Sequence, residues 1–360
     1  MMKQINYIST SLTSKTIQKT ILSSVLQEGF WSRWIAHGLN KEVINKNKSY
    51  FINLDGWIKI FQDEAQNLIT KANKFIEKED FLQAEQHYRL ASLYFNLIQW
   101  IFPESNEVKG MWYEKCLEVF EQADRLSENQ IIKQSIKVKD KTFIGRVRKP
   151  QRDPLGVIII VNPIDSNKEE LFTYENDFAE AGFAVVNFDG PGQGESLLFN
   201  KHKANQESWS SFLENIIDFS NDTFPGIPIH LFGTSSGGAW AIEAGKHPLV
   251  SKIVAVSPPP KADIKMPDYF KERMLNMLED FDKGFLPDLK ELQLVENIIV
   301  FHGLQDVMIE DQDLYYLFDQ LSSEKRLITY EDEGHCCNFR LPELRQRAMN
   351  WFKGEKINEV

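Results

Sequence analysis

The chain has 360 residues, of which 42% are hydrophobic and 26% are charged, and its formal net charge is -11. This composition is that of a globular protein, long enough for one catalytic domain and a further segment of roughly a hundred residues. The negative charge, without a dense cluster of lysine and arginine, excludes a nucleic-acid partner.

The cysteine content and the lengths of the apolar runs indicate the compartment in which the chain is expected. Cysteine occurs at positions 116, 336 and 337, without the spacing of a disulfide framework or a zinc site, so we expect a reducing compartment and no metal. The first residues lack the features of a signal peptide, and no apolar run reaches the roughly 20 residues needed to cross a bilayer. The sequence therefore predicts a soluble, cytoplasmic protein without a membrane partner.

Residues 1–134 are predicted to form an all-helical N-terminal cap domain. Apolar residues recur at helical spacing in three stretches, 57–75, 90–100 and 108–120. Their aromatic side chains are interpreted as core, but three of the domain's aromatic residues are candidates to line a pocket against the second domain: Trp31, Trp34 and Tyr94. The apolar helical half would allow a homodimer, although the sequence leaves the oligomeric state open.

From residue 135 to 360 the pattern changes to that of an α/β catalytic domain. Alternating apolar residues at 136–138 and 143–147 predict an opening hairpin. After it, strands and helices are expected in turn at 157–161, 169–181, 184–188, 209–219 and 229–232. This alternation predicts a mostly parallel sheet with helices on both faces.

Two loops follow strands at the edge where such sheets bind ligands. The first, residues 162–167, is expected to supply an oxyanion-binding N–H. Because Pro163 has no N–H, Ile164 or Asp165 is the predicted donor. The second, the glycine-rich segment 189–196, lacks the Gly-Lys-Ser/Thr ending of a phosphate-binding loop and is interpreted as structural.

Residues 233–238, Gly-Thr-Ser-Ser-Gly-Gly, lie between a predicted strand and a predicted helix. A strand that turns sharply into a helix needs glycines around its central residue, which is strained and closely packed. This pattern predicts a nucleophile elbow with Ser235 as the nucleophile. The backbone N–H of Ser236 and the positive end of the following helix would then stabilise an oxyanion.

Residues 261–290 are interpreted as a helical insertion rich in methionine and phenylalanine. Its predicted contribution to a substrate-binding apolar pocket comes from Met266, Phe270, Met274 or Met277. For each of these residues, packing in the core is the alternative interpretation.

The remaining catalytic candidates lie in loops after two later strands. Asp306 follows the strand-like run 298–303, and His335 follows the run 327–330, so the order is Ser, Asp, His. This order predicts that His335 accepts the proton of Ser235 while Asp306 orients the imidazole.

Each of these assignments has an alternative that the sequence leaves open. Asp306 could cap the following helix, and Asp332 is the rival acid. His335 could be a surface-loop residue, and the alternative histidine, His302, is interpreted as a packed residue at a strand end. Cys336 and Cys337 are interpreted as packing residues behind the triad.

Several of these segments together resemble the FrsA-like branch of α/β-hydrolases: 157–161, 165–170, 187–195, the Ser235 elbow and 334–338. Within it, the pattern is most similar to a nicotine-pathway enzyme that hydrolyses a carbon–carbon bond, with fungal polyketide-shortening hydrolases as more distant relatives. The resemblance implies the α/β-hydrolase fold, a helical domain over the active site, and Ser235, Asp306 and His335 as the triad.

The predicted function is that of a cofactor-independent serine hydrolase that forms an acyl-enzyme with a small, largely apolar acyl substrate. The bond cleaved could be an ester, a thioester or the carbon–carbon bond of a ketone. In the last case Asp165 or His335 would protonate the leaving group. Acyl transfer is a further outcome of the same intermediate, and a non-catalytic binding or regulatory protein on a hydrolase scaffold is the alternative from another class.

Overall fold

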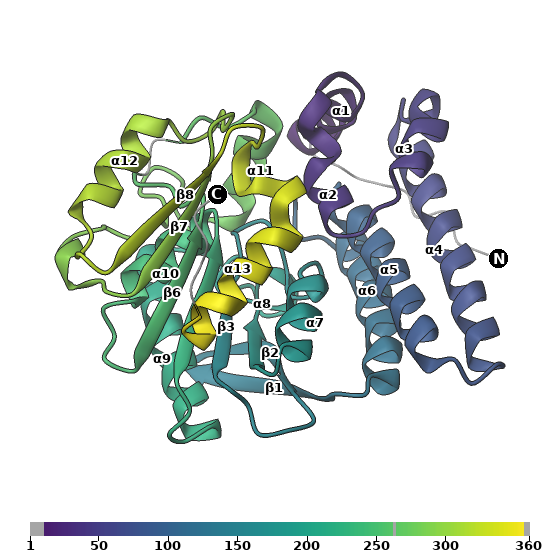
Figure 1. Cartoon of the computed structure of the whole chain (residues 1–360). Helices are drawn as coiled ribbons and strands as arrows, with labels where there is room; N and C mark the ends of the chain where they lie inside the picture. Colours follow the sequence, from purple (N-terminus) through teal and green to yellow (C-terminus); the bar gives the residue numbers. More distant parts are fainter. Residues whose placement is uncertain (1–10, 262–263, 356–360) are drawn as a thin grey trace.

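The structure, a computed structural model, describes residues 11–261 and 264–355 of the chain. Within these residues an N-terminal helical region precedes an eight-stranded sheet that is flanked by further helices (Figure 1). The sheet begins at Gln130, ahead of the domain boundary predicted at residue 135.

The helical region contains α1 (Ser11–Leu26), α2 (Ser32–Ala36), α3 (Lys41–Asn47), α4 (Leu54–Ile76), α5 (Phe81–Trp100) and α6 (Glu107–Leu126). Two short 3-10 turns lie between these helices: Glu28–Trp31 separates α1 from α2, and Lys48–Tyr50 separates α3 from α4. The three predicted stretches correspond to α4, α5 and α6. Helices α1 to α3 were not predicted, because α1 is rich in serine and threonine and the other two are short.

Side-chain caps and apolar stripes explain why α4, α5 and α6 form. Asn53, Asp80 and Asn106 each accept a hydrogen bond from a backbone N–H in the first turn of their helix. Helix α5 packs against both α4 and α6, and it is buried along most of its length (Figure 1). Trp34 and Tyr94 are buried within this helical core, as is Trp31, which agrees with the interpretation of the aromatic residues as core.

The sheet has the strand order β1-β2-β4-β3-β5-β6-β7-β8. Its strands are β1 (Gln130–Val138), β2 (Lys141–Lys149), β3 (Val157–Val161), β4 (Ala184–Phe188), β5 (Ile229–Thr234), β6 (Val250–Val256), β7 (Ile298–Gly303) and β8 (Lys325–Tyr330). The pair β1 and β2 forms the predicted antiparallel hairpin, β2 is also antiparallel to β4, and all later pairs are parallel. The prediction of a mostly parallel sheet is confirmed.

Helices cover both faces of the sheet: α7 (Phe172–Glu180), α8 (Gly194–Leu198), α9 (Gln206–Thr223), α10 (Ser236–Ala244), α11 (Asp268–Met277), α12 (Asp311–Gln320) and α13 (Leu341–Lys353). Neighbouring residues of β3 point to opposite faces, as the pleat of a strand requires. Ile158 packs in a core with side chains of α7 and α13, whereas Ile159 packs in a core with side chains of α9, α10 and α12. Both faces are therefore buried, which accounts for the continuous apolar runs of the parallel strands.

The insertion before β7 is less helical than its sequence pattern predicted. The helical pattern expected over residues 261–290 is realised in α11, and no other helix forms in the described part of this segment. Gly284 has a φ of +68°, and Pro287 follows it, so the chain cannot continue as a helix there. Residues 262–263 lie outside the described residues.

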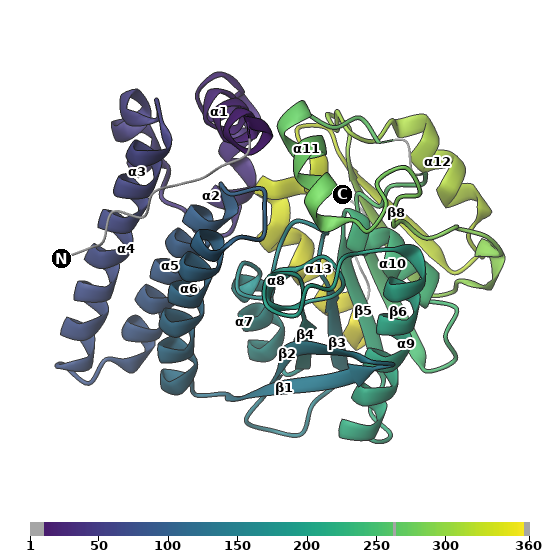
Figure 2. The same ribbon diagram turned by 180° about the vertical axis from the view of Figure 1, so that it is seen from behind.

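The helical region contacts the rest of the molecule at several places. Helix α1 packs against α11, and α2 packs against the 3-10 turn His335–Arg340 (Figure 2). No helix in the described part of the chain has the length and apolarity needed to span a bilayer.

Candidate active site

Three predicted catalytic residues follow the carboxyl ends of strands β5, β7 and β8. Ser235 is the residue between β5 and α10, Asp306 lies in the loop after β7, and His335 begins the turn after β8. Because β5 to β8 run parallel, these ends lie at the same edge of the sheet. Backbone hydrogen bonds join the last two loops, including one of 2.8 Å from the N–H of Gln305 to the carbonyl of Glu333.

The three side chains form a continuous hydrogen-bonded chain. His335 Nε2 lies 2.8 Å from Ser235 Oγ, and His335 Nδ1 lies 2.8 Å from Asp306 Oδ2. The other carboxylate oxygen of Asp306 accepts hydrogen bonds from the N–H groups of Met308 and Ile309, at 2.8 and 3.1 Å. The carboxylate is therefore held on both sides and presents one oxygen to the imidazole.

Ser235 has the strained backbone expected of an elbow. Its φ is +51° and its ψ is -126°, a backbone conformation that residues other than glycine rarely adopt. A Cβ at Gly237 would collide with the carbonyl of Val161, and a Cβ at Gly233 would collide with the carbonyl of Gly237. The flanking glycines are thus needed for the close packing of the turn, as the sequence pattern predicted.

The turn that carries His335 is also strained. Cys336 and Cys337 have φ values of +66° and +49°, which turn the chain sharply after the histidine. Cys337 is fully buried in the core beside α13, in agreement with its interpretation as a packing residue, and both cysteines are free. The N–H of Cys336 donates to Ser257 Oγ at 3.1 Å.

The surroundings of the triad shift the pKa values of its two ionisable groups. Burial alone would lower the pKa of His335, but the Cys336 sulfur and the Asp306 carboxylate raise that pKa well above its ordinary value. Burial alone would raise the pKa of Asp306, but His335 and the two backbone donors keep that pKa below its ordinary value. The geometry thus favours an ionised Asp306 and an imidazole of increased basicity.

This increased basicity leads to a testable pH dependence. If His335 acts as the base, it must be neutral, so kcat/KM for an ester should rise with pH and have its midpoint above 6.5. Cys336→Ala should move this midpoint to lower pH, because it removes one of the two groups that raise the pKa. Cys116→Ala, a change at a buried cysteine of the helical core, is the control and should leave the midpoint in place. An identical pH profile for Cys336→Ala and the wild type would contradict this account.

Three backbone N–H groups were predicted as candidates to bind an oxyanion. The N–H of Ser236 is at the first position of α10 and has no acceptor among the described residues. The N–H of Ile164 donates to the Ser236 hydroxyl at 2.9 Å, so this predicted donor faces the elbow but is occupied by a side chain that can rotate. The N–H of Asp165, the other predicted donor, has no acceptor in the described part of the chain.

Residues of the helical region donate hydrogen bonds to the side chain of Asp165. Arg33 of α2 donates from Nη1 to both carboxylate oxygens, at 2.7 and 2.8 Å, and Trp100 Nε1 donates to Oδ2 at 3.2 Å. The side chain of Asp165 is 4% exposed. Its carboxylate is thus fully engaged, which favours a positioning role over direct proton transfer to a substrate.

The helical region also forms hydrogen bonds with other side chains between residues 165 and 170. Arg33 also donates two hydrogen bonds to the Glu170 carboxylate, at 2.6 and 2.7 Å, and His37 Nδ1 lies 2.9 Å from it. Tyr113 donates to Glu169 at 2.7 Å, and the amides of Asn96 and Asn167 bond each other at 2.7 and 3.3 Å. We call residues 164–170 the oxyanion segment; one side of it is held by helices of the N-terminal region.

The other side of the oxyanion segment is held by the glycine-rich loop 189–196. Lys168 Nζ lies 2.7 Å from Asp189 and 2.7 Å from Glu195, and all three side chains are buried. Burial alone would lower the pKa of Lys168, but the surrounding carboxylates raise it, so the charge is retained. The loop acts here as a support, in keeping with its interpretation as structural.

The rival catalytic residues have other partners. Asp332 is on the surface and pairs with Arg340 at 2.8 Å. His302 is fully buried, and its Nε2 lies 2.8 Å from Asp311 Oδ1. Helix α12 begins at Asp311 without a side-chain cap, so Asp306 does not cap it.

The insertion contributes both predicted and unpredicted residues to this region. Met274 and Met277 are buried in the core that includes Ile164, and Met266 and Phe270 pack against it while partly exposed. Their part in a substrate pocket stays a prediction. Sequence reasoning missed Arg33 and Arg273, because no motif marks them and their partners lie far away along the chain.

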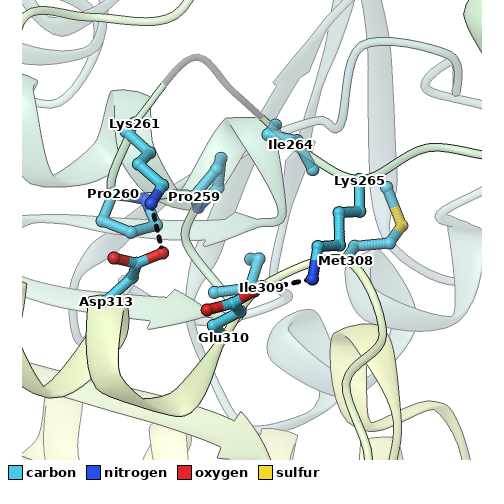
Figure 3. A pocket seen from close by; sticks show the side chains of 9 residues that line it. All are labelled: Pro259, Pro260, Lys261, Ile264, Lys265, Met308, Ile309, Glu310 and Asp313. Carbon is cyan, nitrogen blue, oxygen red and sulfur yellow. Dashed lines mark hydrogen bonds and ion pairs between the residues drawn. The ribbon is translucent and has the colours of Figure 1, made fainter.

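A small cavity of about 90 Å³ adjoins the loop that carries Asp306 (Figure 3). Its lining includes Met308 and Ile309, whose N–H groups hold the carboxylate of Asp306. Two ion pairs lie across it, Lys261 with Asp313 and Lys265 with Glu310, each at 2.6 Å. In the described residues, no cluster of three or more His, Cys, Asp and Glu side chains is arranged to hold a metal ion.

Comparisons of sequence relate the chain to hydrolases. A family profile described as serine aminopeptidase, S33, matches residues 152–295, which include the elbow but end before Asp306. The chain is 24% identical over 220 residues to the α/β-hydrolase xenA of Xenoacremonium sinensis, covering 57% of this chain and 51% of that protein. It is 23% identical over 189 residues to 2,6-dihydropseudooxynicotine hydrolase of Paenarthrobacter nicotinovorans, covering 52% and 51%. The chain thus spans about half the length of the curated relatives it matches.

Comparison of structure extends the likeness to the helical region. The solved structure of 2,6-dihydroxy-pseudo-oxynicotine hydrolase matches with a TM-score of 0.75 at 19% identity, covering 92% of this chain and 98% of that chain. A likeness at this level of identity shows a shared fold. These findings confirm the resemblance to α/β-hydrolases and, among them, to the nicotine-pathway enzyme.

Proposed function

We propose that this chain, an α/β-hydrolase in fold and in sequence relationship, is a serine hydrolase that works through an acyl-enzyme. The observation that carries the proposal is the hydrogen-bonded chain from Ser235 through His335 to Asp306, with its two distances of 2.8 Å. A serine hydroxyl is a weak nucleophile near neutral pH, and an adjacent imidazole oriented by a carboxylate removes this weakness.

The proposed reaction has two steps. Ser235 Oγ attacks the carbonyl carbon of the substrate while His335 Nε2 takes the hydroxyl proton. The oxyanion that forms is stabilised by the N–H of Ser236 and an N–H of the oxyanion segment. Collapse of this intermediate expels the leaving group, which receives the proton from His335. Water, deprotonated by His335, then cleaves the acyl-enzyme and restores Ser235.

The engagement of Asp165 leaves His335 as the remaining acid of the two predicted for carbon–carbon bond cleavage, so an ester or thioester is the first candidate for the bond cleaved. Cleavage of a ketone carbon–carbon bond releases a carbanion that an acid must protonate. Asp165 is already bound through both carboxylate oxygens by Arg33, so His335 is the better candidate for that acid. Carbon–carbon bond hydrolysis therefore stays the second candidate, favoured by the likeness to 2,6-dihydropseudooxynicotine hydrolase.

A substrate panel tests the class of bond. Wild type and Asp165→Asn should be assayed with p-nitrophenyl esters, acyl thioesters and 1,3-diketones, with release of each product followed directly. We expect turnover of esters or thioesters, and a similar proportional loss on every active substrate in the variant, because Asp165 acts by positioning the oxyanion segment. Cleavage of a 1,3-diketone that Asp165→Asn alone abolishes, with ester hydrolysis retained, would instead assign Asp165 as the acid of a carbon–carbon bond hydrolase.

A further inference from the structure

Among the described residues, two buried cations beside the oxyanion segment have no carboxylate partner. Lys109 of α6 is 5% exposed, and Arg273 of α11 is 0% exposed. In the described part of the chain, neither side chain forms an ion pair, and no hydrogen bond involves Lys109 Nζ. Arg273 donates to neutral acceptors, the carbonyls of Trp100 and Ile101 and the Thr20 hydroxyl, while its Nε has no acceptor in the part of the chain that the structure describes.

These cations lie where the helical region, the insertion and the oxyanion segment meet. The guanidinium of Arg273 lies 3.9 Å from the centre of the Trp100 ring, and Trp100 Nε1 donates to Asp165. Met277 lies on the same helix as Arg273. The carbonyl of Met277 and the side chain of Ile164 both lie close to Gly192. Arg273 is therefore linked through the side chain of Trp100 to Asp165. Asp165 follows Ile164, and the N–H of Ile164 faces the nucleophile elbow.

The charges at this junction do not balance. Asp165 is the carboxylate that acts electrostatically on both Lys109 and Arg273, but Arg33 already binds both of its oxygens. Burial and the neighbouring Arg273 lower the pKa of Lys109 to about 7, and burial lowers the pKa of Arg273 to about 10. Buried charge without a partner is costly, and a bound anion would relieve this cost.

We propose that Lys109 and Arg273 form an anion subsite that binds a carboxylate carried by the acyl part of the substrate. The proposal rests on the proposed hydrolase function, since it names the class of substrate for that same site. A carboxylate would pair with the Lys109 ammonium and would give Arg273 Nε the acceptor that it lacks among the described residues.

A pair of matched esters tests this subsite. p-Nitrophenyl hemiglutarate has a free carboxylate at the end of its acyl chain, and its methyl ester lacks that charge. In the wild type, kcat/KM for the hemiglutarate should exceed that for the methyl ester by at least about tenfold. Lys109→Met should lower kcat/KM for the hemiglutarate by at least about tenfold more than it lowers kcat/KM for the methyl ester, so that the preference is lost. Lys71→Met, which removes an exposed lysine of α4, is the matched control and should change neither value.

Binding measurements separate failure of the subsite from failure of the proposed function. Calorimetric titration of the wild type should show glutarate binding at least about tenfold more tightly than neutral glutaramide, and this arm holds even if Lys109→Met does not fold. If neither ester is hydrolysed but glutarate binds with this preference, the hydrolase function fails and the subsite stands. If both esters are hydrolysed equally and glutarate binds no better than glutaramide, the function stands and the subsite is overturned.

Discussion

Ser235→Ala is expected to reduce ester hydrolysis by about 10⁵-fold or more and to abolish labelling by a fluorophosphonate. The Oγ of Ser235 is the atom placed 2.8 Å from His335 Nε2, and no rotation of a neighbouring side chain can restore it. The backbone at residue 235 keeps its strained conformation in the variant, so the melting temperature should not change. Steady-state rates with p-nitrophenyl esters, and intact mass after labelling, measure the two effects.

An exposed serine provides the control for this experiment. Ser210→Ala in α9 removes a hydroxyl far from the elbow along the chain and should label and turn over like the wild type. Labelling of Ser235→Ala at another residue would assign the nucleophile elsewhere. Absence of labelling and of turnover in the wild type would favour a binding or regulatory protein on this scaffold.

Arg33→Met is expected to lower the free energy of unfolding by about 3–5 kcal/mol, the usual cost of removing one partner from a buried ion pair. The guanidinium neutralises Asp165 and Glu170, whose side chains are 4% and 1% exposed, and methionine would leave both carboxylates buried without it. The variant should also lose kcat/KM, because the oxyanion segment loses its link to α2. Denaturant unfolding and ester kinetics, measured below the new transition, test the two results.

The pH dependence of stability distinguishes this ion pair from ordinary packing. Burial alone would raise the pKa of Glu170, but Arg33 and His37 lower it to about 2. Because the folded pKa is depressed, the stabilisation is present above the unfolded pKa of about 4.3 and is lost as the pH falls towards 2. Arg33→Met should weaken this loss between those two pH values.

A surface arginine supplies the matched control for the ion pair. Arg125→Met removes an arginine whose side chain is 76% exposed and lies 3.9 Å from Glu121, so it should change stability by less than about 1 kcal/mol. Equal stability of Arg33→Met and Arg125→Met would refute the view that the helical domain is tied to the oxyanion segment by this pair.

Local chemistry explains which parts of the site could be predicted. The glycines around Ser235 are needed by the turn itself, and Asp306 and His335 each follow a strand of an alternating α/β pattern, so short segments carry this information. Cap residues and apolar spacing likewise predicted α4, α5 and α6. The helical insertion was overestimated because spacing alone did not register the effect of Gly284 and Pro287 on the chain.

The sequence by itself determined the mostly parallel sheet, the helical region before it and the three residues that now form one hydrogen-bonded chain. Periodicity and turn chemistry act over a few residues, and parallel strands bring their carboxyl ends to one edge without further information. Only the tertiary structure decided that Arg33 holds Asp165 and Glu170, and that Lys109 and Arg273 lie buried without a carboxylate partner among the described residues. The contacts of Arg33 and Arg273 join residues more than a hundred positions apart, and whether a buried charge is balanced depends on which groups the folded chain places around it.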